Sequence, residues 1–305
     1  MNSKTKPNLK NILIVLKPKV INEFSNILPN LTDWLQHRKK NILFHEHEIE
    51  RIGKIYKNIP KNFNFIADSQ THKLPDLIIT LGGDGTLIGV ARKVTKNSPP
   101  IFGVNMGRLG FITEFSKVEF FDALFETLNG RFEILKTNLF QAEVFKKGKS
   151  IFKGTFLNDA VINKNNISRM LSLSIETESE LISHISGDGL IVSSPVGSTA
   201  YSLAAGGPIL HPDVNALLIT PICAHALTHR PLVLPNRHSI CIKTPSNETN
   251  VVLTLDGQEM IDLSGGSTIK ISYCQAKHIK LIKNSDRTYY QTLKEKFHHG
   301  RKSIV

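Results

Sequence analysis

The chain has 305 residues, of which 40% are hydrophobic and 21% are charged, a composition typical of a globular protein. Its net charge of +12 is scattered along the chain with no recognisable nucleic-acid module, which favours a pocket for anionic small molecules over nucleic-acid binding. No apolar run reaches the roughly 20 residues of a membrane helix, no secretion signal is visible and three widely spaced cysteines fit a reducing compartment, so we expect a cytoplasmic protein.

The first part of the chain predicts strands that alternate with helices, which is typical of a parallel sheet with crossover helices. Ligands of such sheets bind beyond the carboxyl ends of the strands. The predicted elements are strands at 11–16, 41–45, 76–81 and 101–104, a helix at 20–39 interrupted at Pro29, a loop with a short helix at 46–74, a helix of about three turns after the strand at 76–81, and a helix at 117–128.

From about Leu139 onward, short strands separated by polar or glycine turns predict a mostly antiparallel second domain. We expect an α/β domain at 1–137, a β domain at 138–285 and a C-terminal helix within 286–305 that returns to the first domain. The predicted later elements are strands at 140–146, 151–157, 160–163, 171–176, 190–193, 240–243, 251–255 and 269–273 and a helix at 287–297.

The glycine-rich sequence Gly82-Gly83-Asp84-Gly85-Thr86 follows a buried strand and precedes a helix. Such a backbone can approach a phosphate closely, and a helix N-terminus supplies positive potential. Asp84 is unusual there, because an acid beside phosphates can bind a metal or accept a proton from an attacking hydroxyl. The loop matches neither the G-x-G-x-x-G fingerprint nor a Walker A loop. It therefore predicts phosphoryl transfer, the alternative being a turn that merely tolerates an Asp.

A second candidate segment, residues 187–208, has the sequence GDGLIVSSPVGSTAYSLAAGGP. It predicts a strand, a turn, and a helix that begins near Ser198 and ends at Gly-Gly-Pro. Ser198 and Thr199 are natural N-cap residues, which would leave N–H groups facing an anion. Tyr201 offers a flat face for a purine. The alternative is a capped structural helix.

Three shorter segments leave alternatives open. Asn158-Asp159 interrupts the apolar run 156–162, where strand alternation would place Asn158 on an apolar face that requires a ligand or a turn as its partner. Asp256-Gly257-Gln258 by itself favours a hairpin turn. His45-Glu46-His47-Glu48 resembles a metal cluster but lacks H-E-x-x-H spacing, so we expect a solvated strand end.

Together these segments resemble the NAD kinase family over roughly residues 10–297. The matching pieces are GGDGT at 82–86, NMGRLGF at 105–111, Asn158-Asp159 at the family's Asn-Glu pair, the long segment 187–208 and Asp-Gly-Gln at 256–258. The first piece is shared with diacylglycerol kinases, sphingosine kinases and phosphofructokinases, whereas the long segment is specific. The combination and its order carry the resemblance.

The resemblance implies an α/β domain followed by a β-sandwich-like domain, homodimers or homotetramers, and Mg²⁺-dependent transfer of the ATP γ-phosphoryl group to the 2′-hydroxyl of NAD. Asp84 would be the general base, and Mg²⁺ (or another divalent cation) would be held mainly by the nucleotide phosphates. The implied phosphate loop is Gly82, Gly83, Gly85 and Thr86. The implied dinucleotide-binding residues are Asp84, Gly85, Phe111, Asn158, Asp159, Arg169, Ser186, Asp188, Thr199, Ala200, Tyr201, Ser202, Leu203, Ala204 and Gln258.

The chain departs from the family pattern at two positions. Asp159 stands where Glu is usual and is one methylene shorter, and Val196 replaces a Thr hydroxyl in the long segment. The alternatives are a lipid kinase that shares the first signature, a non-catalytic nucleotide sensor or a nucleic-acid-binding protein. Within the family, inorganic polyphosphate is an alternative donor, and NADH is an alternative acceptor.

Overall fold

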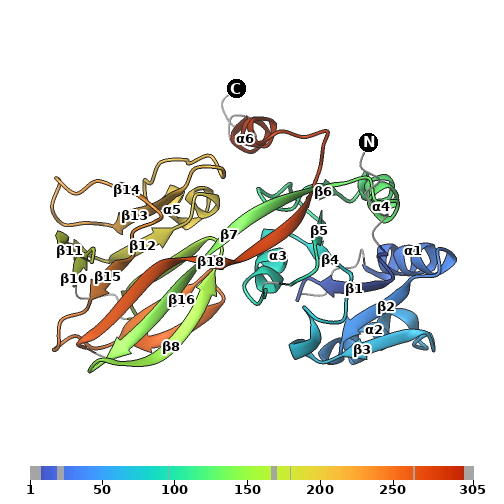
Figure 1. The fold of residues 1–305 in the computed structure, drawn as a ribbon, viewed down its shortest axis with the longest axis horizontal. Helices are drawn as coiled ribbons and strands as arrows, with labels where there is room; N and C mark the ends of the chain where they lie inside the picture. Colours follow the sequence, from blue (N-terminus) through green and yellow to red (C-terminus); the bar gives the residue numbers. More distant parts are fainter. Residues whose placement is uncertain are drawn as a thin grey trace. The chain divides into compact units, whose positions relative to one another are not determined.

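The computed structural model describes residues 8–18, 24–95, 97–165, 170–178, 180–263 and 265–298. The chain forms two compact units, one of residues 1–137 with 279–305 and one of residues 138–278. It leaves the first unit within strand β7 and returns within strand β18 (Figure 1).

Unit 1 contains a parallel sheet in the order β5-β4-β1-β2-β3, extended at β5 by a parallel pairing of Leu281 in β18 with Ile101. Its strands are β1 (Asn11–Leu16), β2 (Asn41–His45), β3 (Phe63–Ile66), β4 (Leu77–Gly82), β5 (Ile101–Asn105) and the short β6 (Phe115–Ser116). All six residues of β4 are buried, as expected for a central parallel strand covered on both faces.

Helices cover both faces of this sheet. Alternate residues of β1, such as Ile12 and Ile14, share one core with the apolar faces of α1, α2 and α4, whereas Leu87 of α3 packs over Gly103 on the other face. The helices of unit 1 are α1 (Phe24–His37), α2 (Ile49–Tyr56), α3 (Asp84–Ala91), α4 (Phe120–Leu128) and α6 (Tyr289–His298), with short 3-10 helices η1 (Glu46–Glu48) and η2 (Asp68–Gln70).

Unit 2 is built from antiparallel sheets around its own core. One sheet has the order β14-β13-β12-β9-β16-β17, and the other contains β11-β10-β15-β18 together with the β7–β8 hairpin. Alternate residues of both sheets, such as Ile162 of β9 and Ile242 of β15, meet in one hydrophobic core, the arrangement of a β-sandwich.

The elements of unit 2 include two long strands that straddle the division between the units. The strands are β7 (Glu133–Lys146), β8 (Lys149–Phe156), β9 (Asp159–Lys164), β10 (Leu171–Glu176), β11 (Leu181–Gly187), β12 (Gly189–Ser193), β13 (Ala216–Ile222), β14 (Leu232–Pro235), β15 (Ile240–Lys243), β16 (Val251–Leu255), β17 (Glu259–Leu263) and β18 (Ser267–Lys283). The 3-10 helix η3 (Val196–Thr199) precedes the four-residue helix α5 (Tyr201–Ala204).

The predicted fold class is confirmed: parallel strands with crossover helices in the N-terminal part and antiparallel sheets in the C-terminal part. The predicted interruption of the first helix at Pro29 is wrong, because α1 continues through this residue. The missing N–H of Pro29 removes one bond near the start of the helix, and the buried face containing Leu28, Leu31 and Leu35 holds the helix together. Among the described residues, no helix has the length and apolarity needed to span a membrane.

Candidate active site

Asp84 is the first residue of α3 and follows directly from the carboxyl end of β4. β4 ends at Gly82, and Gly83 is the N-cap in an extended conformation with no side chain to offer the helix. An acid in the first turn of a helix is stabilised by the helix dipole. The sequence prediction of a strand, a glycine loop and a helix is correct here, although α3 has two turns rather than three.

The Asp84 carboxylate is fixed by the segment that follows β5. Its Oδ2 accepts a hydrogen bond from the Phe111 N–H at 2.7 Å, and its Oδ1 accepts from the N–H of Thr113 at 3.0 Å and from the Thr113 hydroxyl at 2.9 Å. The Ile112 N–H adds a longer bond to Oδ1 at 3.3 Å. Three of the four donors bond Oδ1, so Oδ2 retains more accepting capacity for an incoming donor.

Residues at the two ends of the segment 105–111 help to hold the loop that bonds Asp84. The buried Asn105 amide donates to the Thr113 hydroxyl at 2.9 Å and accepts from the Gly107 N–H at 2.8 Å. At the other end, a side chain on Gly110 would place its Cβ 1.8 Å from Asp84 Oδ1. Gly110 therefore permits the close approach that lets the loop bond the carboxylate.

Two glycines beside Asp84 have no such packing role. A Cβ added to Gly83 or to Gly85 would meet no atom of the described residues within 4 Å. Gly85 lies inside α3, where glycine costs about 0.5–1 kcal/mol relative to alanine. Open space at the residues on both sides of an acid is what a phosphate group needs for close approach to the backbone.

Glu114, which sequence analysis did not single out, lies beside this loop. Burial raises the pKa of its carboxyl, and the negative charge of Asp84 raises it further. A hydrogen bond from the Asn284 N–H and the positive charges of Lys283 and Arg287 lower this pKa. Its Oε2 accepts from the Asn284 N–H at 3.3 Å. The available sequence signal was an acid three residues after Phe111, the end of the second signature. Glu114 ties the segment after β18 to the loop that holds Asp84.

Phe111 is half-buried, and the Lys296 ammonium lies 5.3 Å from its ring centroid. A cation over an aromatic ring is a favourable contact. Helix α6 therefore contributes a positive charge to the same loop, within unit 1.

In unit 2, Asn158 lies in a bend between two strands. β8 ends at Phe156 and β9 begins at Asp159, so the predicted break between the strands at 151–157 and 160–163 is confirmed, whereas the side-chain alternation carried across 156–162 does not hold at the bend. β8 pairs with β7, whereas β9 pairs with β12 and β16, and the bend at 157–158 allows this change of partners.

The bend is held by the hairpin turn of Asp256. The Asp256 carboxylate accepts hydrogen bonds from the N–H groups of Leu157 at 2.9 Å, Asn158 at 2.7 Å and Asp159 at 3.1 Å. Asp256 and Gly257 both have positive φ, at 53° and 64°, as a tight hairpin requires. The hairpin interpretation of Asp256-Gly257 is therefore correct, and its side chain has the further role of shaping the Asn158 bend.

The Asn158 side chain leaves a polar atom without a partner. Its Oδ1 is buried and accepts no hydrogen bond from the described residues. A buried acceptor without a donor costs about 1–3 kcal/mol, so the site is incomplete without a ligand or water that donates to it. Of the two partners left open by sequence analysis, the turn bonds the Asn158 backbone, and the side-chain oxygen remains available.

Asp159 is 5% exposed, and its pKa is raised to about 7. Burial is the main cause and the nearby Asp256 charge the second, while a hydrogen bond from the Tyr201 N–H opposes both. The shorter side chain that replaces the usual Glu thus contacts the start of α5.

The segment 194–204 packs its backbone against the Asn158 bend. The Ser194 N–H donates to the Asn158 carbonyl oxygen at 2.8 Å, and the Ser194 hydroxyl donates to the Leu157 carbonyl oxygen at 2.5 Å. A Cβ on Gly197 would lie 2.0 Å from the Asn158 carbonyl oxygen. Gly197 is therefore required for this contact.

The predicted N-cap roles of Ser198 and Thr199 are wrong. Both lie inside η3, where their hydroxyls donate to the carbonyl oxygens of Pro195 and Val196, and Ala200 is the residue that precedes α5. The Ser198 hydroxyl also accepts from the Leu210 N–H at 2.9 Å. These local bonds to backbone compete with helix capping.

The remaining predicted residues of this segment differ in exposure. Tyr201 is 48% exposed, so its ring is accessible for stacking, whereas Ser202 is fully buried and its hydroxyl bonds Thr220 at 2.8 Å. Ala200 and Leu203 are half-buried, and Ala204 is exposed.

The last predicted residues lie at the connection between β11 and β12 and at the β16–β17 hairpin. Asp188 is exposed at the β11–β12 turn, where its interaction with the Cys223 thiol raises the pKa of that thiol. The Ser186 hydroxyl lies 2.9 Å from the Ser172 hydroxyl. Gln258 is exposed at the Asp256 turn, and Arg169 lies outside the described residues.

The chain matches two family models that together cover most of its length. The model described as ATP-NAD kinase N-terminal domain matches residues 12–132, and the one described as ATP-NAD kinase C-terminal domain matches residues 157–284.

Curated relatives and solved structures agree with these matches. A protein of Geotalea daltonii named NAD kinase is 37% identical over 276 residues, 90% of this chain and 94% of the relative, and one of Syntrophotalea carbinolica with the same name is 40% identical over 74% of this chain and 79% of the relative. The crystal structure of yeast NADH kinase in complex with NADH matches with a TM-score of 0.85 at 27% sequence identity. The match covers 98% of this chain and 89% of the yeast chain. An Archaeoglobus fulgidus NAD kinase solved with ATP shares the fold, with a TM-score of 0.71 at 21% identity over 94% of this chain and 98% of its own.

Proposed function

The chain belongs to the NAD kinase family, and from this premise we propose that it transfers the γ-phosphoryl group of ATP to the 2′-hydroxyl of the adenosine ribose of NAD. The family relationship makes it an enzyme, a phosphotransferase. The products are NADP and ADP. The observation that carries the proposal is the Asp84 carboxylate, fixed by four donors beside the open space at Gly83 and Gly85.

Asp84 accepts the proton of the attacking hydroxyl in this proposal. The bond between the 2′-oxygen and the γ-phosphorus forms as the bond to the β-phosphate oxygen breaks, the proton passes to Asp84 Oδ2, and ADP leaves. Such proton transfer is worth about 10²–10⁴-fold in rate. Oδ2 is suited to this role because only the Phe111 N–H bonds it among the described donors.

The residues of unit 2 bind the dinucleotide. Asn158 Oδ1 lacks a donor and would accept from a ligand hydroxyl or amine, and the exposed Tyr201 ring would stack on a base. The NADH that accompanies yeast NADH kinase supports a dinucleotide as the acceptor class. We assign supporting contacts to Asp188, Gln258 and the backbone of 199–204.

Mg²⁺ would neutralise the charge of the donor phosphates. Magnesium usually keeps several waters and takes one or two carboxylates together with phosphate oxygens, so no protein cage is required. The residues present fit this demand, because Asp84 is a carboxylate beside a backbone with room for phosphate and hydrated cation. ATP is the proposed donor. Polyphosphate as donor and assembly into dimers or tetramers are left to a donor panel and to a measurement of mass in solution.

The test is the variant Asp84→Asn, assayed for NADP formation from NAD, ATP and Mg²⁺. We expect turnover to fall by about 10²–10⁴-fold, while the dissociation constants for NAD and ATP change little. Asn can still accept at one oxygen but cannot accept the Phe111 bond with its amide nitrogen, so thermal unfolding is measured in parallel.

Thr113→Val is the matched control, because it removes one donor to Asp84 and keeps the carboxylate. It should lose far less turnover than Asp84→Asn. Full activity of Asp84→Asn, or equal losses in both variants, would refute the role of Asp84 as base.

A further inference from the structure

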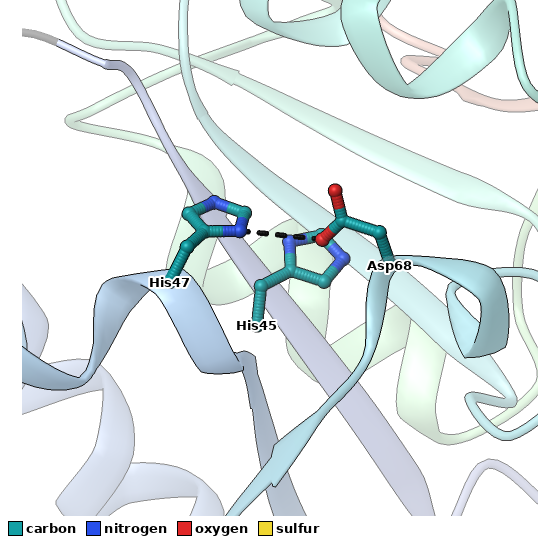
Figure 2. Close-up of side chains that lie close together, drawn as sticks. All are labelled: His45, His47 and Asp68. Carbon is teal, nitrogen blue, oxygen red and sulfur yellow. Dashed lines mark ion pairs between the residues drawn. The ribbon is translucent and has the colours of Figure 1, made fainter.

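Three possible metal ligands converge at the carboxyl ends of β2 and β3, which lie two and three strand positions from β4 in the parallel sheet. His45 is the last residue of β2, His47 lies in η1, and Asp68 is the first residue of η2 after β3 (Figure 2). One ligand atom from each of the three lies within 4.8 Å of the others. The parallel register pairs His45 with Ile66, which brings Asp68 to the same edge. The sequence motif could not show this, because Asp68 is remote from both histidines along the chain.

The expectation of a solvated strand end is wrong for His45, which is 7% exposed. β2 lies between β1 and β3, so the side chain at its end is enclosed by the connections that follow the neighbouring strands. His47 and Asp68 are exposed, with 59% and 55% of their side chains accessible. The group therefore has one buried anchor and two ligands that solvent can reach.

The hydrogen bonds of Thr71 fix the tautomer of His45. The Thr71 hydroxyl donates its single proton to the Asp68 carbonyl oxygen at 2.7 Å. It must therefore accept from His45 Nε2, which lies at 2.8 Å. A neutral imidazole that carries its proton on Nε2 has a free lone pair on Nδ1. His45 thus presents Nδ1 as a metal ligand that needs no deprotonation.

The two ring nitrogens of His47 also face different groups. Its Nδ1 lies 3.2 Å from Asp68 Oδ1, and its Nε2 faces Glu48 Oε1 at 3.8 Å. Histidines that bind metals almost always direct the second nitrogen to a carboxylate or another oxygen, which orients the ring. Lys93 approaches only the other Asp68 oxygen, Oδ2, at 4.0 Å. The second nitrogen of His45 is therefore hydrogen-bonded to an oxygen, and that of His47 faces a carboxylate at ion-pair distance.

We propose that His45, His47 and Asp68 bind one Zn²⁺ ion, with water in the remaining position. Two imidazoles and a carboxylate suit zinc better than the oxygen-seeking Mg²⁺. Zinc bonds of about 2.0–2.2 Å place tetrahedral ligands roughly 3.4 Å apart, close to the 3.2 Å between His47 and Asp68. The wider limit of 4.8 Å closes to this spacing by a movement of at most about 1.4 Å, which the exposed side chains of His47 and Asp68 can make.

This metal is distinct from the Mg²⁺ of phosphoryl transfer. Lys93, which contacts Asp68, lies just beyond the end of α3, whereas Asp84 begins that helix. Eight helical residues span about 12 Å. The Zn²⁺ site therefore belongs to the far end of α3, and its occupancy can be measured without nucleotide or turnover.

The test uses the full chain without a histidine tag, stripped with a chelator, and titrated with Zn²⁺ by calorimetry in excess Mg²⁺. We expect one Zn²⁺ per chain in the wild type, and visible d–d bands of Co²⁺ when cobalt replaces zinc. His47→Ala and Asp68→Asn remove exposed ligands. Because loss of an outer partner alone costs about 10–100-fold in metal affinity, these variants should bind at least tenfold more weakly.

Two further variants make the outcome decisive. Thr71→Val removes the acceptor of the His45 proton and should weaken binding about tenfold. His211→Ala disrupts a His–Asp ion pair of 3.5 Å in unit 2 and should leave Zn²⁺ affinity unchanged. Circular dichroism checks that each variant is folded. Absence of Zn²⁺ binding by the wild type, or equal affinity in wild type and His47→Ala, would overturn the proposal.

Discussion

At the residue scale, the glycines around Asp84 are of two kinds: one is required by the packing of the protein, and two are not. Gly110 has Asp84 Oδ1 where its Cβ would lie, whereas Gly83 and Gly85 face open space. A glycine that the protein's own packing does not require is a candidate for contact with a ligand. This distinction can be tested with one added methyl group at each kind of position.

Gly85→Ala should uncouple activity from stability. Alanine is a better helix former, so the free energy of unfolding should stay equal or rise by about 0.5–1 kcal/mol. The methyl group would occupy the space assigned to phosphate, and a displacement of about 1 Å can cost 10²-fold in rate. We expect kcat/KM to fall by about that factor in the NADP-forming assay, with denaturant unfolding measured on the same sample.

Gly110→Ala is the matched control for Gly85→Ala. Its methyl group would collide with Asp84 Oδ1 and the Thr113 hydroxyl, so the loop must move. Overpacking of this kind costs about 1–3 kcal/mol, and both stability and activity should fall. If Gly85→Ala retained full activity, the space beside Asp84 would not be a phosphate site.

At the element scale, the β16–β17 hairpin positions a bend in a different part of the chain. Asp256, in a left-handed conformation at φ 53°, bonds three consecutive N–H groups of 157–159. The hairpin therefore controls where the Asn158 side chain is held. Asp-Gly as a turn was predictable from sequence, but its long-range partner was not, because nothing in the local pattern identifies the other strand.

Asp256→Ala should destabilise the protein by about 3–5 kcal/mol. The change adds strain at positive φ, about 1–3 kcal/mol, and leaves backbone N–H groups of the bend without acceptors. It should also raise KM for NAD, because the Asn158 bend loses its support. Chemical denaturation and initial-rate kinetics measure the two effects.

Asp256→Asn separates the contributions to that loss. Asn tolerates left-handed backbone and keeps one acceptor oxygen, so its cost should be clearly smaller. A loss below about 1 kcal/mol in Asp256→Ala, with KM unchanged, would show that the bend is held by other contacts.

Strands at sheet edges account for most of what sequence analysis missed. β10, β15 and β16 were predicted with their observed bounds, and all three have neighbours on both sides. β3, β11, β14 and β17, which were not predicted, all end a sheet path. Edge strands need fewer apolar residues because one side faces no partner strand. The central β13 was missed for another reason, since Pro221 interrupts its apolar run.

At the scale of the whole molecule, two separate cores stabilise the chain, and each supports its own group of candidate site residues. The core of unit 1 anchors β4 and β5, which carry Asp84 and its loop, and the core of unit 2 anchors β9 and β16, which carry Asp159 and the Asp256 turn. Alternating strands and helices predicted the first architecture. The motifs predicted Asp84 and Asn158, but the burial of Asp159 depends on packing among strands distant in sequence.

The buried Asp159 should make global stability depend on pH. Its folded pKa of about 7 lies above its ordinary 3.8, so the fold favours the protonated form. This contribution is fully present below pH 3.8 and is lost as pH rises through 7. The loss amounts to about 4 kcal/mol at most, since each unit of pKa corresponds to about 1.4 kcal/mol. Removing the ionisable group should abolish this part of the pH profile.

Asp159→Asn is therefore expected to gain stability relative to the wild type as pH rises from 4 to 8, because the amide stays neutral and can still accept from the Tyr201 N–H. The measurement is the free energy of unfolding by urea at several pH values in that range. Asp256→Asn, which removes the neighbouring charge and keeps Asp159, should retain much of the wild-type trend, because burial is the larger cause. A constant difference between wild type and Asp159→Asn across the range would mean that the pKa of Asp159 is the same in the folded and unfolded states, which would contradict the raised pKa.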